Sequence, residues 1–290
     1  MEVIDLERID DQTEEICIKA VKQNGLSLEF VKNQTDKICF KAVKSNWLAL
    51  QFVNDQTEEI CIEAANQSIK ALEMVRNQTK EICWAALINN ASALEYIRDQ
   101  KRDMCFVAVM QSPHYLQYVH DQTEELCLVA IRRGYGDLSF VRNETEKVCL
   151  EAVKLYAYAL WHIENQTEEM GLIAVKQDGN AIRYVNDKTE KVCRKAMRKN
   201  GLALMHIDID KRTEELCLIA VKQDGRALKY VENQTEEICL IAVRQNGDAL
   251  RYVREQTEEL CFMAVDNPVF RTDIDRLDIG DDKRLDTVLR

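Results

Sequence analysis

The sequence predicts an all-α protein, an α-solenoid of about twelve 22-residue helix-turn-helix repeats, for which we expect a right-handed superhelix. Two observations carry this prediction. All eleven cysteines share one phase of a 22-residue period, and an alanine follows three residues later in all twelve copies of the repeat. A fixed period of this length is typical of stacked repeats and not of a domain folded around a single centre. The cysteines are Cys17, Cys39, Cys61, Cys83, Cys105, Cys127, Cys149, Cys193, Cys217, Cys239 and Cys261, and Gly171 takes the place of the twelfth.

We number each repeat from the position four residues before the cysteine, which we call register 0. This position is threonine in every copy except one, where it is Lys101. The period is interrupted by two inserted residues between Thr189 and Thr213. The threonines are Thr13, Thr35, Thr57, Thr79, Thr123, Thr145, Thr167, Thr189, Thr213, Thr235 and Thr257.

Residues 233–255 form a clean copy that indicates what one repeat builds. Asn233 offers a side-chain oxygen to cap a first helix, and Glu236 completes a capping box. We expect this helix to end near Gly247, because glycine suits the left-handed conformation that follows many helices. A second, shorter helix is expected to carry its apolar residues on one side, namely Ala249, Leu250, Tyr252 and Val253.

The apolar positions of the first helix span an arc of about 200°, which is wider than one partner helix can cover. Each first helix must therefore pack on its own second helix and on both neighbouring repeats. The ends of such a stack need caps. Residues 4–11 match the second helix of a repeat, so we predict that residues 1–11 form an N-terminal half-repeat cap. The solenoid is expected to span residues 12–266, and residues 267–290 are expected to form a C-terminal cap or tail.

Charge and cysteine content limit the class of protein. A net charge of −11 does not favour nucleic acid as a ligand, because nucleic-acid-binding domains are usually basic. No apolar run approaches the roughly 20 residues of a membrane span, and residues 1–9 lack the features of a signal peptide. An odd number of cysteines without an export signal indicates a reducing compartment. We therefore expect a cytoplasmic protein that does not contact a membrane.

The cysteines suggest a metal or redox site, but the repeat geometry disfavours one. Equivalent residues of stacked helices lie about 8 to 10 Å apart, too far to ligate one zinc ion or to form a disulfide. We predict that the cysteines are buried apolar spacers. The chain also lacks phosphate-loop, metalloprotease and nucleophile-elbow motifs. The sequence therefore predicts no catalytic residues, no metal and no cofactor, and we do not expect an enzyme.

In the middle of the chain, the outer face of the first helices becomes apolar. Registers 6 and 9 carry lysine in the first repeat, at Lys19 and Lys22, but apolar residues in the central repeats. A contiguous apolar surface on a solenoid is typical of a partner-binding site. The alternative is that superhelical bending buries these residues, as the isoleucines at 173, 219 and 241 in the same register suggest. The predicted partner-binding residues are Ala85, Ile88, Val107, Met110 and Val129, together with the aromatic Tyr115 and Trp161.

Two further kinds of interaction, with nucleic acid and between copies of this protein, are consistent with the sequence. Helical repeats can read successive bases of RNA, and register 19 offers a basic stripe for a modular or sequence-tolerant RNA or DNA binder. Self-association is also possible, because register 16 is acidic in the first half of the chain and basic in the second. The stripe consists of Arg76, Arg98, His120 and Arg142, and the register 16 charges are Glu29, Glu73 and Glu95 against Arg183, Lys229 and Arg251.

The strings AVKQNGLSLEFVKNQT and AVKQDGRALKYVENQTEEICLIAVRQNGDALRYV resemble an uncharacterised family of short helical repeats that is abundant in giant DNA viruses of amoebae. The resemblance extends from residue 3 to about residue 266, and it is weakest in the central repeats. It implies an α-helical repeat protein in an intracellular, viral setting, hence in the host cytoplasm. Our interpretation is a repeat scaffold that mediates protein–protein interaction with an unknown protein partner.

Overall fold

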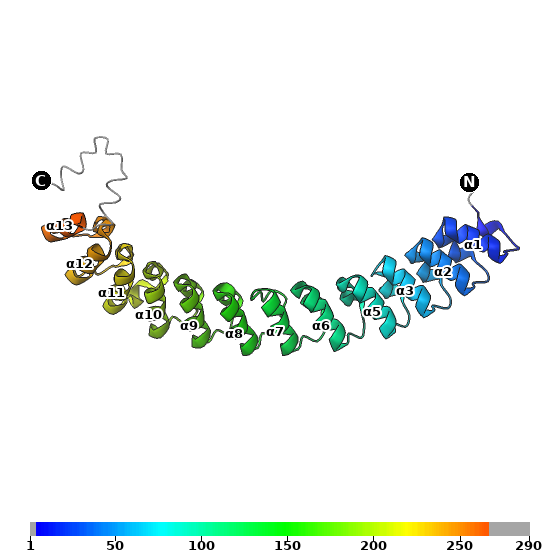
Figure 1. Cartoon of the computed structure of the whole chain (residues 1–290), viewed down its shortest axis with the longest axis horizontal. Helices are drawn as coiled ribbons and strands as arrows, with labels where there is room; N and C mark the ends of the chain where they lie inside the picture. Colours follow the sequence, from blue (N-terminus) through cyan, green and yellow to red (C-terminus); the bar gives the residue numbers. More distant parts are fainter. Residues whose placement is uncertain (1–3, 267–290) are drawn as a thin grey trace, which may run out of the picture. The chain divides into compact units, whose positions relative to one another are not determined.

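The structure is a computed structural model that describes residues 4–266, and every regular element in that range is a helix (Figure 1). The all-α prediction is therefore confirmed. The cap or tail expected at residues 267–290 lies outside the described residues. Contacts divide the chain into two compact units. The first unit comprises Met1–Gly134 and Phe140–Asn143, and the second comprises Tyr135–Ser139 and Glu144–Arg290.

Each repeat contributes one first helix, and successive first helices pack against one another within a unit (Figure 1). The first unit contains α1 (Glu14–Gln23), α2 (Asp36–Ser45), α3 (Glu58–Gln67), α5 (Lys80–Asn89), α6 (Arg102–Gln111) and α7 (Glu124–Arg133). The second unit contains α8 (Glu146–Leu155), α9 (Glu168–Gln177), α10 (Glu190–Lys199), α11 (Glu214–Gln223), α12 (Glu236–Gln245) and α13 (Glu258–Asp266). This regular stack confirms the α-solenoid, while the handedness of its superhelix stays a prediction.

The second helices form another row that packs against the first, and nearly all of them are 3-10 helices. Six residues are enough for two tight turns, and 3-10 helices are rarely longer. The first unit contains η1 (Leu6–Arg8), which lies in the expected half-repeat, η2 (Gly25–Phe30), η3 (Trp47–Phe52), the short α4 (Ala71–Met74), η4 (Ala91–Tyr96) and η5 (Pro113–Tyr118). The second unit contains η6 (Ala157–His162), η7 (Gly179–Tyr184), η8 (Gly201–His206), η9 (Ile209–Lys211), η10 (Gly225–Tyr230) and η11 (Gly247–Tyr252).

The predicted N-cap of the first helix was wrong. Helix α12 begins at Glu236, so its cap is Thr235, whose hydroxyl accepts a hydrogen bond from the N–H of Ile238 at 3.4 Å. Asn233 lies two residues too early to serve. Asparagine and aspartate instead cap the second helices, as when the side chain of Asn246 accepts from the N–H of Asp248 at 3.0 Å. In α6 the threonine is replaced by Lys101, and this helix has no side-chain cap at that position.

The role predicted for the turn glycines was also wrong. Gly225 begins η10 with an ordinary negative φ, and the left-handed residues among those described are Tyr135 and Gly136, between α7 and α8. Glycine is needed at position 225 because the chain there approaches the next first helix. A Cβ would lie 2.3 Å from the carbonyl oxygen of Ala242. The glycine is therefore selected by close contact between repeats and not by its backbone freedom.

The glutamine immediately before register 0 connects successive second helices through hydrogen bonds to their backbone groups. In Gln100, Nε2 donates to the carbonyl oxygens of Leu94 and Tyr118, each at 2.8 Å, and Oε1 accepts from the N–H of His120 at 2.8 Å. One amide thus satisfies three backbone groups from two repeats. We call the glutamines that bond the following second helix the bridging glutamines: Gln12, Gln34, Gln56, Gln78, Gln100, Gln122, Gln166 and Gln234.

Candidate partner-binding surface

The predicted apolar surface lies on three consecutive first helices of the first unit, α5, α6 and α7. Ile88 is 72% exposed, Met110 48% and Val107 37%, whereas Ala85 and Val129 are half-buried. Three large apolar side chains are therefore open to solvent on α5 and α6. The alternative in which bending buries them does not hold in this unit. We call the five residues the apolar surface.

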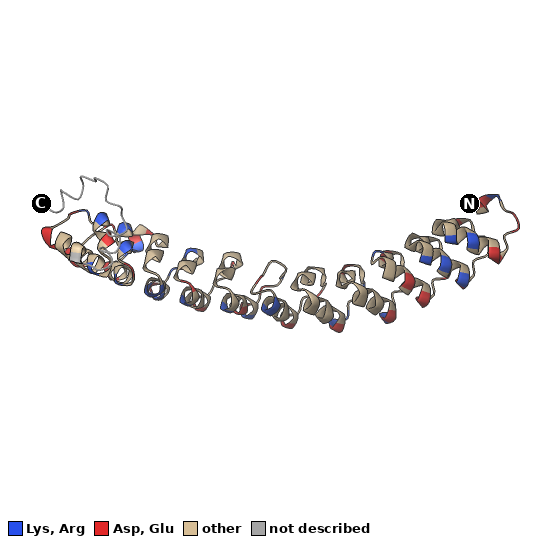
Figure 2. Ribbon diagram, turned by 45° about the horizontal axis from the view of Figure 1, so that its top comes forward, with Lys and Arg blue, Asp and Glu red and all other residues tan. Residues whose placement is uncertain are grey.

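Two of the three helices that carry the apolar surface, α5 and α6, are nearly uncharged, whereas α7 carries Glu124, Glu125, Arg132 and Arg133. The charged residues of α5 are Lys80 and Glu81, and those of α6 are Arg102 and Asp103, so all of them lie in the first turn (Figure 2). The outer faces of most other first helices in the unit carry lysine, arginine or glutamate, as α2 does at Lys44. An exposed apolar face with charge only at its edge is typical of a protein interface.

The two aromatic residues predicted alongside the apolar surface lie on second helices. Tyr115 of η5 is half-buried, and its ring centroid lies 6.3 Å from that of Tyr118. Trp161 of η6 belongs to the second unit, where it is 69% exposed and its ring meets that of Tyr184 edge-on at 5.3 Å. Both residues thus take part in aromatic contacts of the second-helix row and not in the face formed by α5, α6 and α7.

The arginines of the basic stripe at register 19 hydrogen-bond backbone carbonyl groups within the first unit. The guanidinium of Arg76 donates to the carbonyl oxygens of Asn54 at 2.6 Å and Val53 at 3.1 Å. Arg98 repeats this arrangement one repeat later, with Nη2 at 2.8 Å from the carbonyl oxygen of Val75, and Arg142 donates to the carbonyl oxygen of Val119. These arginines therefore bind the backbone of the preceding repeat, while all three residues stay exposed. The nucleic-acid alternative stays a prediction.

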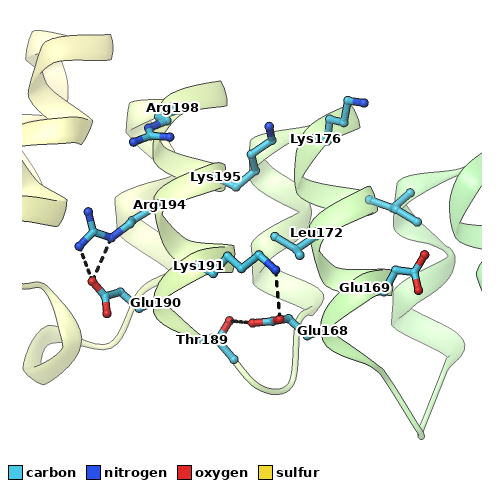
Figure 3. A pocket seen from close by; sticks show the side chains of 11 residues that line it. Glu168, Glu169, Leu172, Lys176, Thr189, Glu190, Lys191, Arg194, Lys195 and Arg198 are labelled. Atoms are coloured by element: carbon cyan, nitrogen blue, oxygen red, sulfur yellow. Dashed lines mark hydrogen bonds and ion pairs between the residues drawn. The ribbon is translucent and has the colours of Figure 1, made fainter.

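The second unit contains a groove that sequence analysis did not identify. It lies between the outer faces of α9 and α10 and has a volume of about 790 Å³ (Figure 3). The half-buried side chains of Leu172 and Ile173 contribute apolar surface to it. The signal in the sequence is on α10, where Arg194 and Lys195 replace the aliphatic residues found at the same registers of the neighbouring helices.

One end of this groove is electrically balanced. Lys191 lies 3.5 Å from a carboxylate oxygen of Glu168, and Arg194 pairs with Glu190 and with Glu215 of α11. The hydroxyl of Thr189 donates to Glu168 at 2.7 Å. This hydrogen bond, assisted by Lys191, holds the pKa of Glu168 below its ordinary value. The cations at this end therefore already have anionic partners.

The other end of the groove is cationic. Lys176 of α9 and Lys195 and Arg198 of α10 are all exposed. Figure 3 shows Lys176 and Arg198 towards the C-terminal ends of the two helices, with Lys195 between them. Among the described residues, no carboxylate lies within ion-pair distance of these three side chains. The groove therefore combines an apolar floor with a cluster of unneutralised cations at one end.

The predicted burial of the cysteines is confirmed, since ten of the eleven are buried and Cys261 is half-buried. Burial raises the pKa of Cys61 to about 11. Burial and the neighbouring carboxylate of Glu144 raise the pKa of Cys149 to about 11. These thiols are therefore protonated, and poor nucleophiles, at neutral pH.

We expect eleven free thiols in the denatured protein and slow reaction of nearly all of them in the folded protein at about pH 8. A thiol pKa raised by folding stabilises the native state below about pH 9, and this contribution is lost as the pH rises through about 11. Alkaline unfolding should accompany thiol ionisation. Timed alkylation followed by mass spectrometry measures the number of free thiols and the rate at which each reacts. An intact disulfide, or rapid labelling of the buried thiols, would contradict the expectation.

Comparisons with known proteins identify a similarity in the second unit. A family model described as Domain of unknown function (DUF4116) matches residues 189–235 and 213–261. No curated protein and no solved structure matches the chain. No helix among residues 4–266 is long and apolar enough to cross a membrane. The family match overlaps the repeats that contain α10, α11 and α12, so the region of similarity is built from the repeats described above.

Proposed function

We propose that this protein is a non-catalytic repeat scaffold that binds a protein partner through the apolar surface of its first unit. The observation that carries the proposal is the exposure of Ile88, Val107 and Met110 on adjacent helices. Together they form a hydrophobic patch of the kind that buries against a partner. We expect the partner to present aliphatic or aromatic side chains, because burying apolar area is the main source of affinity for such a face.

Two further features support a role in binding and not in chemistry. The first helices form a regular stack, so the apolar surface is held by rigid elements that need little reordering on binding. The thiols, the most reactive groups of the repeat, are buried and protonated. We propose a cytoplasmic location, in the host if the chain is viral, where reduced thiols persist. Self-association through the register 16 charges stays a prediction, and Arg251 at this register already pairs with Asp248 at 3.2 Å.

A photo-crosslinking amino acid placed at position 110 tests the proposal. We expect a discrete cross-linked product with the partner in host extract, because Met110 lies on the apolar surface and is 48% exposed. The matched control carries the same group at Lys44, an exposed position of the same register on α2. A product of equal yield from both positions, or none from position 110, would contradict the proposal. Mass spectrometry of the position 110 product would identify the partner.

A further inference from the structure

The groove between α9 and α10 differs from the surfaces between neighbouring first helices in its charge. Helix α10 carries five cationic residues, Lys191, Arg194, Lys195, Arg198 and Lys199, and one acidic residue, Glu190, giving a net charge of +4 in a chain whose net charge is −11. Helix α2 is also net positive, at +2, but α10 carries the largest positive excess among the first helices. Because the protein as a whole is acidic, a cationic groove of this kind attracts anions locally.

Complementing the helix dipole explains only part of this charge. Cations in the last turn stabilise the negative C-terminal end of a helix, which accounts for Lys176 on α9 and Arg198 on α10. It does not account for Lys195, which lies nearer the middle of α10. At the same register the flanking helices have Ile173 and Ile219, and one register earlier Arg194 stands where they have leucine. Helix α10 thus departs from its neighbours at positions that line the groove.

We propose that this groove binds an acidic peptide segment of a protein partner, with an apolar side chain on Leu172 and Ile173 and carboxylates on Lys176, Lys195 and Arg198. Exposed ion pairs are individually weak, so the apolar floor supplies the anchor and the three cations supply orientation and selectivity for acidic residues. The guanidinium of Arg198 can bind one carboxylate through two parallel hydrogen bonds. The proposal uses different residues, a different unit and a different ligand chemistry from the apolar surface, and so goes beyond the proposed function.

Fluorescence anisotropy with the full chain tests this proposal. The probe is a fluorescein-labelled peptide in which one leucine is followed by four aspartates, flanked by glycine and serine. We expect binding in the micromolar range at about 50 mM salt, weakening as the salt concentration rises. The double variant Lys195→Glu, Arg198→Glu should bind about tenfold more weakly or worse, because it replaces two attractive charges by two repulsive ones.

The matched control is Lys41→Glu, Lys44→Glu, which makes the same charge changes at the same registers of α2. We expect the control to bind the peptide as the wild type does, and a peptide with alanine in place of leucine to bind more weakly. Equal losses in both double variants, or equal binding of the two peptides, would overturn the proposal. A single-stranded oligouridylate that binds more tightly than the peptide and depends on Lys195 and Arg198 would also overturn it, by assigning the groove to nucleic acid.

The double variant Val107→Glu, Met110→Glu separates this inference from the proposed function. Its substitutions lie in the first unit, so it should retain full affinity for the acidic peptide. Loss of peptide binding in this variant would contradict a groove confined to α9 and α10. Failure of the peptide to bind the wild type would overturn the groove as a site for acidic peptides and would leave the proposed function intact, because the apolar surface lies on other helices.

Discussion

Replacing Gln100 by glutamate is expected to destabilise the first unit by about 3 kcal/mol or more. A carboxylate cannot donate to the carbonyl oxygens of Leu94 and Tyr118, which Gln100 now binds at 2.8 Å each. It would instead place a negative charge against two partly buried carbonyl oxygens. Each unsatisfied buried polar group costs about 1 to 3 kcal/mol, and the charge adds to the cost. The measurement is the free energy of unfolding from urea denaturation followed by circular dichroism.

Gln111→Glu is the matched control, since it makes the same chemical change at an exposed position at the end of α6. Its effect should stay within about 0.5 kcal/mol. Gln100→Met, which removes the hydrogen bonds without adding charge, should give an intermediate loss. Equal stability of the glutamate variant at position 100 and the control would show that the bridging glutamines do not hold successive repeats together.

The chain itself supports the donor role of the bridging glutamines. In the repeat with two inserted residues, the position is occupied by Arg212, which donates to the carbonyl oxygens of Ile207 at 2.9 Å and Tyr230 at 2.6 Å. A different side chain thus performs the same bridging between repeats. Glutamine and arginine both supply a donor that reaches two carbonyl groups. Glu144 stands at this position before α8, where the structure has no 3-10 second helix between α7 and α8.

The sequence predicted the features that depend on periodic burial. The recurrence of cysteine and alanine predicted helices that pack closely through small side chains, and Cys127 and Ala130 are indeed buried. Features that depend on side-chain hydrogen bonds could not be predicted in the same way. Asn233 and Thr235 are both good helix caps, and the choice between them depends on where the helix begins. Gln234, which lies between these two residues, donates to the carbonyl oxygen of Tyr252 at 2.9 Å, a contact that periodicity does not reveal.

The candidate site was predictable where it depended on composition and not where it depended on geometry. The apolar residues at Ile88 and Met110 depart from a charged consensus, and this departure is visible in the sequence. The sequence could not show that Arg76 and Arg98 would turn towards backbone carbonyl groups, because those groups belong to the preceding repeat. The groove on α10 was missed because its cations resemble ordinary helix-end charges until the neighbouring helices are compared register by register.

The double variant Val107→Glu, Met110→Glu is expected to keep its stability. Both side chains are exposed, at 37% and 48%, so each glutamate can extend its carboxylate into water without leaving a cavity. Substitutions of this kind usually change the free energy of unfolding by no more than about 0.5 kcal/mol. The melting temperature should therefore stay close to that of the wild type. A large fall would show that the two residues contribute to the packing of the unit and would remove them as a binding surface.

Capture of the cross-linked partner by this folded double variant tests the central claim most directly. Two carboxylates on the apolar surface would have to be desolvated in the interface without a partner charge, which costs several kcal/mol. Because about 1.4 kcal/mol corresponds to a tenfold change in affinity, capture should fall at least a hundredfold. The control Lys41→Glu, Lys44→Glu should capture the partner as the wild type does. Retained capture by Val107→Glu, Met110→Glu at an unchanged melting temperature would contradict the assignment of the apolar surface as the partner-binding site.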